Sequence, residues 1–180
     1  MGRSSRVIGP EVAGLERAVL DTPDTVTRFL EALTGEVVVA DVVRRYPVVL
    51  GADNQFGAAA GEDATGRIAV LRGSASNLAY LYAESVFLAA RLPETVRLQL
   101  EGTGEPIGRI LADHGLQPVR ATLTHGEEVG AGPPDPAALL DSEVVWSRAY
   151  RLLIEGSPVF VIREWFLHPV LEALGRQDQE

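Results

Sequence analysis

The last long apolar stretch of the chain, residues 144–167, constrains its fold more than any other segment. Two runs rich in β-branched and aromatic residues flank residues 155–158, which have the composition of a turn, and this pattern predicts a β-hairpin. In the second run, VFVIREWFL, the two-residue period of a strand places Glu164 on the same face as Phe160 and Ile162. Because burying an unpaired charge is costly, this carboxylate needs a partner or a functional purpose.

Helical segments are predicted from apolar spacing and from residues that favour helix ends. Residues 10–20 are expected to form a short amphipathic helix. In the next helix Thr22 can cap, Pro23 suits the first helical position and Gly35 ends the helix. Residues 93–115 contain two helix starts separated by a Gly-Thr-Gly link, so they predict a helical hairpin.

Strands are predicted mainly in hairpins. Residues 36–43 form a β-branched run that Pro47 should limit, and residues 67–73 and 78–90 form a hairpin around a turn at 74–77. Two stretches without periodicity are expected to be a loop and a surface excursion: 51–66 and 117–135. Strands in hairpins, rather than single strands alternating with helices, favour an α+β fold with an antiparallel sheet.

The length of the chain and the lack of an internal repeat or linker predict one domain over residues 1–180. Residues 1–20 are expected to form an N-terminal helical extension and residues 175–180 a frayed tail. The sequence has no run of about 18 apolar residues, and its start lacks the apolar core of a secretory signal. We therefore expect a cytoplasmic monomer with no membrane association.

The charged residues exclude several classes of function. A net charge of −9 argues against a nucleic-acid partner, and the absence of cysteine removes thiolate catalysis and cysteine metal sites. All 16 basic residues are arginine, which excludes Schiff-base chemistry on lysine, although a GC-rich genome is an alternative cause of this bias. The three histidines lack the spacing of a metal site. No metal and no cofactor are expected.

Two features could bind a small acid. Arg67 opens an apolar strand, and a guanidinium can bind a carboxylate bidentately, although a surface arginine at a strand end is the alternative. The turn at 104–108 enters a helix, so the N–H groups of Ile107 and Gly108 could receive a carboxylate, although every helix has such a start.

Glu164 is the third candidate. One interpretation is a buried acid paired with a structural arginine, either Arg148 or Arg151. The other is a functional carboxylate, because an arginine, backbone amides and a glutamate together would describe a pocket for a small aromatic acid. The residues alone leave both interpretations open.

Five segments in their order and spacing carry a family resemblance: DTPDTVTRFLEAL, RIAVLRG, AESVFLAARLP, EPIGRIL and RAYRLLIEGSPVFVIREWFL. They resemble the chorismate pyruvate-lyases, especially the actinobacterial branch that makes 4-hydroxybenzoate. The resemblance implies an antiparallel sheet with helical flaps over an internal ligand pocket. In that family a strand arginine and backbone amides from two helix starts bind the ring carboxylate, and a glutamate on the last strand meets the hydroxyl end of the product. Arg67, Ile107, Val26 and Glu164 match these positions.

The activity implied by the resemblance is elimination of pyruvate from chorismate to give 4-hydroxybenzoate, without a cofactor. Arg67 and Glu164 would be the catalytic residues, the latter as general acid or base. The partner would be a small aromatic or cyclohexadiene carboxylate. Candidates for binding its second carboxylate are Arg72, Arg148 and Arg151.

Two other functions stay open. Glu164 is flanked by Arg163 and Trp165, which are bulkier than the family leads us to expect, and residues 117–143 are idiosyncratic. Both could reshape the pocket for another reaction of specialised metabolism. The fold also resembles effector-binding domains of bacterial transcription regulators, which would make this a non-catalytic ligand-binding domain. Those regulators need a DNA-binding module, and the residues before the first flap are expected to be too few for one.

Overall fold

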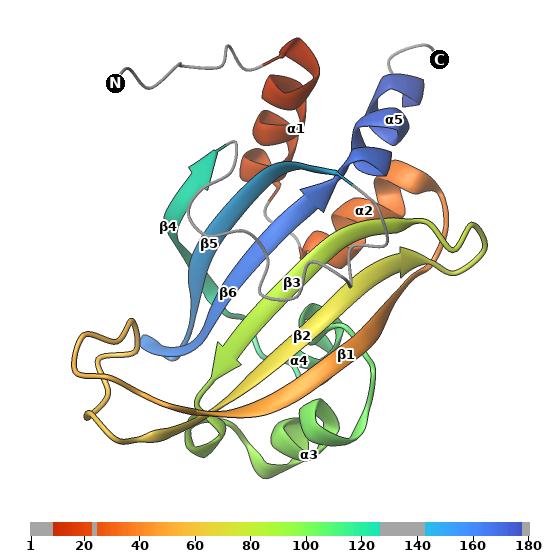
Figure 1. Cartoon of the computed structure of the whole chain (residues 1–180). Helices are drawn as coiled ribbons and strands as arrows, with labels where there is room; N and C mark the ends of the chain where they lie inside the picture. Colours follow the sequence, from red (N-terminus) through yellow and green to blue (C-terminus); the bar gives the residue numbers. More distant parts are fainter. Residues whose placement is uncertain (1–8, 23–24, 127–142, 178–180) are drawn as a thin grey trace, which may run out of the picture.

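The computed structural model describes residues 9–22, 25–126 and 143–177, and within them the chain forms a single α+β domain (Figure 1). Six strands make one antiparallel sheet in the order β1-β2-β3-β6-β5-β4. They are β1 (Val38–Val49), β2 (Asp63–Gly73), β3 (Ala79–Phe87), β4 (Val119–Gly126), β5 (Val144–Ile154) and β6 (Ser157–Leu167). The predicted antiparallel α+β fold is confirmed.

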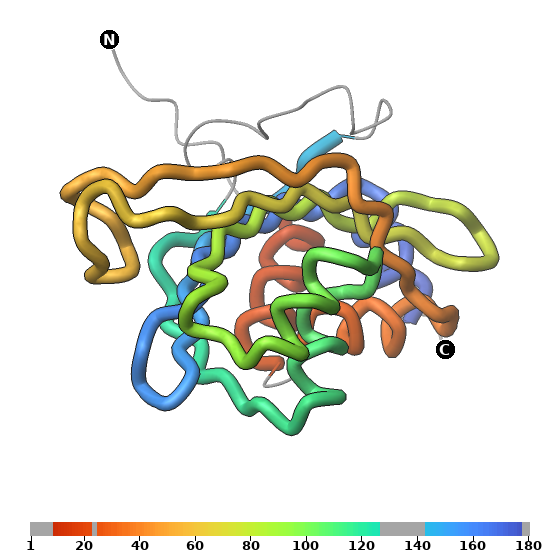
Figure 2. Tube along the Cα trace, turned by 90° about the horizontal axis from the view of Figure 1, so that it is seen from below, coloured from red at the N-terminus to blue at the C-terminus, as the bar shows by residue number. Residues whose placement is uncertain are grey.

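The helices lie against one face of this sheet, as the view from below shows (Figure 2). They are α1 (Pro10–Asp21), α2 (Val26–Thr34), α3 (Glu94–Gly102), α4 (Ile107–Asp113) and α5 (His168–Gln177), with a 3-10 turn, η1 (Ala89–Arg91). No helix in the described ranges has both the length and the apolar character needed to cross a bilayer.

The terminal hairpin is confirmed, with a tighter turn than predicted. β5 and β6 pair from Ile154 and Ser157 onward, so only Glu155 and Gly156 form the turn. Both have positive φ, 50° and 81°, which is the backbone of a two-residue turn that matches strand twist. On β6 the buried face carries Phe160, Ile162 and Glu164, as the period of two predicts.

The predicted start of the second helix is wrong by one turn. α2 begins at Val26 and its N-cap is Thr25, whose hydroxyl oxygen accepts a hydrogen bond from the Arg28 amide at 3.3 Å. Thr22 instead follows the C-terminal end of α1, and Pro23 lies outside the described residues. Gly35 ends the helix in the left-handed conformation, as expected.

Other predicted boundaries also change. β1 continues through Pro47, which is tolerated because β1 is an edge strand with one unpaired side. β2 begins at Asp63, so the loop after β1 is shorter than predicted, and β3 ends at Phe87. Residues 119–126, predicted as surface excursion, form the edge strand β4, and 127–135 lie outside the described residues.

The expected extension and tail are parts of the folded domain where they are described. α1 buries Leu15 and Val19 against α5 and the sheet, so residues 10–21 belong to the core. α5 continues to Gln177, beyond the expected start of the frayed tail.

Two apolar clusters on the helix-covered face leave space between them. One joins α1, α2 and α5 to Trp146 and Phe166, whose ring centroids are 5.3 Å apart. The other joins α3 and α4 to Phe87 and Phe160. Between the clusters, the same face of the sheet carries the small side chains Ala69, Ala83 and Ser85. These small residues leave room for a cavity.

Candidate functional site

A cavity of about 530 Å³ lies between the two clusters, a volume within the range of about 300–1,000 Å³ typical of small-ligand sites. Its floor is the sheet, where residues of β2, β3, β6, β5 and β4 face it. Its roof is formed by the start of α2, with Thr25 and Val26, and the start of α4, with Ile107 and Gly108. The predicted flap residues therefore all line one cavity.

Arg67 lies on the floor of the cavity, and no acidic side chain of the described residues pairs with it. It faces the cavity from β2 and is 3% exposed. Its Nη2 donates to the Glu105 carbonyl oxygen at 2.6 Å, but its buried Nε has no hydrogen-bond partner. In the described parts of the chain no carboxylate forms an ion pair with it. A buried guanidinium in this state is stabilised by an anionic ligand.

Burial lowers the pKa of the Arg67 guanidinium to about 10, and repulsion from Arg45 contributes to the shift. Arg45 is the cross-strand neighbour of Arg67 on β1, and its Nε donates to the Leu100 carbonyl oxygen at 3.3 Å. Arg67 remains positively charged at neutral pH. The two arginines make this end of the cavity electropositive.

The roof helices approach each other closely, and this contact requires a glycine. A Cβ on Gly108 would lie 2.6 Å from Thr25 Cγ2 and 2.7 Å from Thr25 Cβ. The first hydrogen bonds of α4 are donated by Arg109 and Ile110 to the Pro106 carbonyl oxygen, so the amides of Ile107 and Gly108 precede the intrahelical ladder. Both residues line the cavity.

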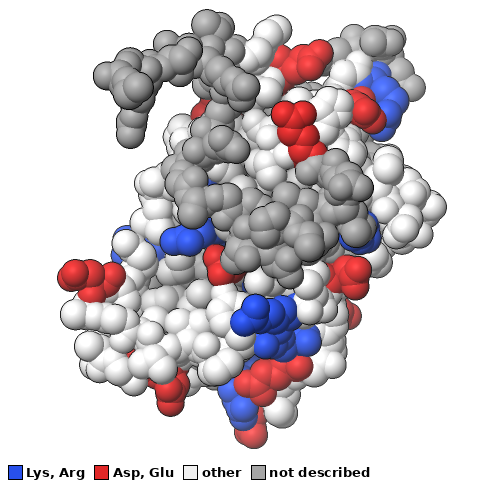
Figure 3. Space-filling model, in the orientation of Figure 1, with Lys and Arg blue, Asp and Glu red and all other residues white. Residues whose placement is uncertain are grey.

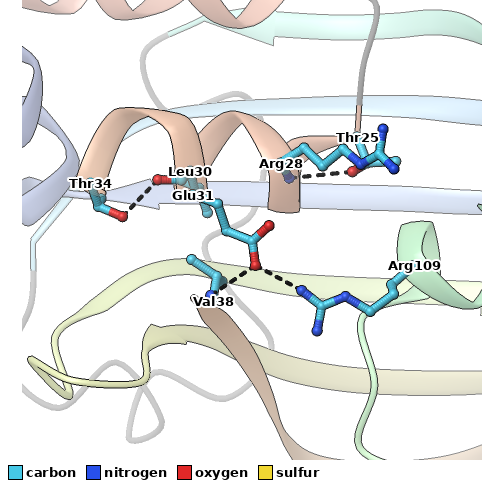
Figure 4. Close-up of polar contacts among 7 residues, drawn as sticks. All are labelled: Thr25, Arg28, Leu30, Glu31, Thr34, Val38 and Arg109. Carbon is cyan, nitrogen blue, oxygen red and sulfur yellow. Dashed lines mark hydrogen bonds and ion pairs between the residues drawn. The ribbon is translucent and has the colours of Figure 1, made fainter. Parts of the chain in front are cut away.

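An ion pair joins the two roof helices. Figure 4 shows the Glu31 carboxylate between α2 and α4, where one oxygen accepts from Arg109 Nη2 at 2.7 Å and from the Val38 amide at 3.0 Å. Glu31 thereby connects α2 both to α4 and to the first residue of β1.

Glu164 lies in the cavity wall with both of its carboxylate oxygens engaged. It is 2% exposed, and its Oε2 accepts from Arg148 Nε at 2.6 Å while its Oε1 accepts from the Tyr150 hydroxyl at 2.7 Å. The pairing with Arg148 was one of the two interpretations open from sequence, and it is confirmed; the alternative partner Arg151 is wrong. Since Glu164 also lines the cavity, the ion pair does not remove it from the site.

The partners of Glu164 respond to its charge. Burial raises the pKa of the Tyr150 phenol, and the neighbouring Glu164 carboxylate raises it further. Burial alone would lower the pKa of Arg148, but attraction to Glu164 and Tyr150 together with hydrogen bonding to both outweighs it, and the pKa is raised. Tyr150 therefore remains a hydrogen-bond donor and Arg148 a cation, and together they fix the Glu164 side chain.

Three arginines predicted to bind a second carboxylate do not line the cavity. Arg72 follows Leu71 on β2 and faces Asp41, with 3.6 Å between Nε and Oδ2. Arg151 follows Tyr150, and its Nη1 donates to the Gln55 carbonyl oxygen at 3.3 Å. For both, the alternation of a strand turns the side chain away. Arg148 contacts Glu164 and the rings of Tyr150 and Phe166 instead.

The bulky residues beside Glu164 do not reshape the cavity. Arg163 is 60% exposed, and its Nη1 lies 3.8 Å from Glu84 Oε2. Trp165 packs edge-on against Tyr82, with 5.6 Å between ring centroids. Both side chains are on the sheet face opposite the cavity.

On the face in view in Figure 3, basic and acidic side chains are interspersed, without a continuous basic stripe.

The residues that line the cavity and were not predicted from the sequence include Tyr150 and Arg120. Tyr150 has no sequence signal that marks it as a site residue, and Arg120 lies in the segment predicted as a surface excursion. The alternation of apolar and polar residues in VRATLTH over residues 119–125 was the available signal for a strand there. The described ranges contain no group of three or more His, Cys, Asp or Glu side chains placed to hold a metal ion.

Comparisons of sequence agree with this architecture. A family model described as "Chorismate pyruvate-lyase Rv2949c-like" matches residues 20–174. The chorismate pyruvate-lyase of Mycobacterium leprae is 25% identical over 175 residues, which cover 90% of this chain and 78% of the relative. The chorismate pyruvate-lyase of Mycobacterium tuberculosis H37Rv is 26% identical over 163 residues, which cover 86% of this chain and 80% of the relative.

Among solved structures, the effector domain of PhnF from Mycobacterium smegmatis matches with a TM-score of 0.59 and 14% sequence identity. The match covers 82% of this chain and 91% of that domain. At this identity the likeness shows a shared fold.

Proposed function

The chain belongs to the Rv2949c-like chorismate pyruvate-lyase family, and from this premise we propose that it eliminates pyruvate from chorismate to give 4-hydroxybenzoate. The observation that carries the proposal is the cavity itself. At one end lies Arg67, a buried arginine that has no acidic partner among the described residues, and at the other a fixed carboxylate, Glu164. This pair matches an aromatic acid whose carboxylate and hydroxyl lie at opposite ends of a ring.

Ring orientation would be the first contribution of the protein. Arg67 would bind the ring carboxylate, and the amides at the start of α4 and α2, at Ile107, Gly108 and Val26, would assist from the roof. The apolar roof and the small floor residues would hold the ring out of water. Because the reaction gains aromaticity, orientation and exclusion of water supply much of what a catalyst needs to add.

The elimination breaks two bonds of the substrate. The C4–H bond gives up its proton, and its electron pair forms the C3–C4 double bond that completes the aromatic ring. The C3–O electron pair leaves with enolpyruvate, which takes a proton on its methylene carbon and becomes pyruvate. Glu164, held by Arg148 and Tyr150 near the C4 oxygen and the C3 ether, would act as the general acid or base for these transfers.

Incubation of the purified protein with chorismate tests the proposal. We expect equal amounts of 4-hydroxybenzoate and pyruvate, measured by liquid chromatography and by a coupled pyruvate assay, at a rate well above that of a protein-free control. The Arg163→Met variant, altered on the opposite face, should match the wild type. Binding of 4-hydroxybenzoate without turnover of chorismate would contradict a lyase and point to a ligand-binding domain. Turnover to another product would indicate a different reaction on the same scaffold.

A further inference from the structure

Arg120 is a cavity-lining cation that the proposed roles leave unused. It lies on β4, and the pairing of Arg120 with Leu152 and of Thr122 with Tyr150 places it on the cavity face of the sheet. Its guanidinium carbon is 5.0 Å from the centroid of the Tyr150 ring. Its Nη1 also lies 3.5 Å from the Thr22 carbonyl oxygen.

Arg120 belongs to the Glu164 end of the cavity. The Tyr150 ring that it contacts carries the hydroxyl that donates to Glu164. Arg67, in contrast, is on β2, and strands β3, β6 and β5 separate β2 from β4. The two arginines therefore approach the cavity from opposite sides of its floor.

The substrate of the proposed reaction carries a second carboxylate at this end. The enolpyruvyl ether is attached to the ring carbon beside the one that bears the hydroxyl. When Arg67 holds the ring carboxylate and Glu164 faces the hydroxyl, the enolpyruvyl carboxylate lies near Glu164 and Tyr150. Arg148 already balances the charge of Glu164, so a further cation is what would attract a second carboxylate to this end.

Other arginines of the cavity region fit this role less well. Arg148 contacts Glu164 directly, whereas Arg72 and Arg151 face away. Arg28 lines the cavity from α2 but is exposed. A guanidinium has five N–H donors, so Arg120 can bind a carboxylate alongside its present contacts.

We propose that Arg120 binds the carboxylate of the enolpyruvyl group and thereby distinguishes the substrate from the product. The inference rests on the proposed lyase function and specifies its second anion subsite. The product, 4-hydroxybenzoate, lacks this carboxylate, so Arg120 contributes to substrate binding and not to product binding. When the C3–O bond breaks, negative charge develops on the departing enolpyruvate, and an adjacent cation stabilises it.

The test compares substrate and product in the same variants. Arg120→Met keeps an unbranched side chain against Tyr150 and removes the charge, Arg120→Lys keeps a charge, and Arg163→Met is the control on the opposite face. For Arg120→Met we expect kcat/KM for chorismate to fall about 10- to 100-fold, since hydrogen bonds between charged groups contribute about 1.5–3 kcal/mol. The Kd for 4-hydroxybenzoate, measured by calorimetry, should stay within about twofold of the wild type. Arg120→Lys should recover part of the loss.

The outcomes separate this inference from the proposed function. Wild-type turnover together with an unaffected Arg120→Met variant would overturn the inference alone. An equal loss of chorismate turnover and of 4-hydroxybenzoate binding would also overturn it, because Arg120 would then act by supporting Tyr150 or the fold, and a thermal melt would identify the latter. A wild-type protein that does not convert chorismate would overturn the proposed function and this inference with it.

Discussion

The two ends of the cavity both bury charge, but they satisfy it differently. At one end Glu164 accepts hydrogen bonds from Arg148 and Tyr150, so its charge is balanced within the protein. At the other end Arg67 is buried with the Glu105 carbonyl oxygen as its hydrogen-bond partner, and no carboxylate of the described residues forms an ion pair with it. The charge of Glu164 is balanced in the free protein, whereas the charge of Arg67 would be balanced by a bound anion.

The Glu164 end therefore contributes to stability and to the position of a side chain, and the Arg67 end to ligand binding. A balanced buried pair holds a side chain in one position, which is what proton transfer requires. A buried cation without a counter-ion disfavours the free folded state and strengthens the attraction for a carboxylate in the same place. Substitutions at the two ends should therefore have different consequences.

The largest effect is expected from Glu164→Gln, on the kcat of the proposed reaction. Removal of an acid/base group lowers rates by about 100- to 10,000-fold, so kcat for chorismate should fall in that range while 4-hydroxybenzoate still binds. Steady-state kinetics and calorimetry measure the two quantities. Full activity of this variant would exclude proton transfer by Glu164.

Arg148→Met should have the largest effect on stability. It leaves the buried Glu164 carboxylate with Tyr150 as its remaining partner among those described, and breaking a buried ion pair costs about 3–5 kcal/mol. Urea titration should show this loss in the free energy of unfolding. An unchanged unfolding midpoint would mean that the Glu164 end is not balanced as described.

Arg67→Met should weaken ligand binding without the loss of stability expected for Arg148→Met. Because no acid among the described residues loses a partner, the free energy of unfolding should stay the same or rise. Affinity for 4-hydroxybenzoate should fall about 10- to 100-fold, as for loss of a charged hydrogen bond. If the variant is strongly destabilised and binds the ligand normally, Arg67 is a structural residue.

Tyr150→Phe should have a smaller effect at the Glu164 end. It removes one donor to a carboxylate that keeps Arg148, so we expect a loss of about 1.5 kcal/mol in stability and a partial loss of kcat. Chorismate affinity should change less than kcat, because the ring carboxylate binds at the other end. A variant with wild-type stability would show that this hydrogen bond is dispensable.

The smallest effect, visible only at high pH, concerns the charge of Arg67. The pKa of this group is lowered to about 10. The affinity for an anion should therefore be constant below that pH and decline about tenfold per pH unit above it. The unfolded chain holds this proton to higher pH, so the same group makes the folded state relatively more stable as pH rises past 10. Benzoate, which has no hydroxyl to titrate, is the probe, and Arg67→Met should lack this decline.

The sequence predicted those parts of the site whose pattern is local. The period of two on β6 placed Glu164 on a buried face, and the apolar run after Arg67 placed that residue at a strand. The start of α2 was misplaced because Thr22 and Thr25 are both good caps and only packing decides between them. Such choices depend on contacts outside the local window.

The family resemblance implied an internal pocket, but the residues that form its floor could not be predicted, because they depend on strand register. Ala69 and Ala83 are ordinary small residues in the sequence, and they form a floor only because β2 and β3 pair them. Arg120 was missed for the same reason, since β4 is a polar edge strand whose partner β5 follows much later in the chain. Strand pairing, and not residue type, determines which arginines lie on the cavity face of the sheet.

The Glu31 carboxylate has a consequence for the timing of turnover. A ligand under α2 and α4 is held in while these helices stay together, and their ion pair is partly exposed, with 35% and 28% of the two side chains accessible. Exposed pairs of this kind contribute about 0.2–1 kcal/mol, which changes an opening rate by at most about fivefold. The Glu31–Arg109 ion pair would therefore slow ligand exchange by no more than about fivefold, and any stronger hold on α2 and α4 would have to come from their other contacts.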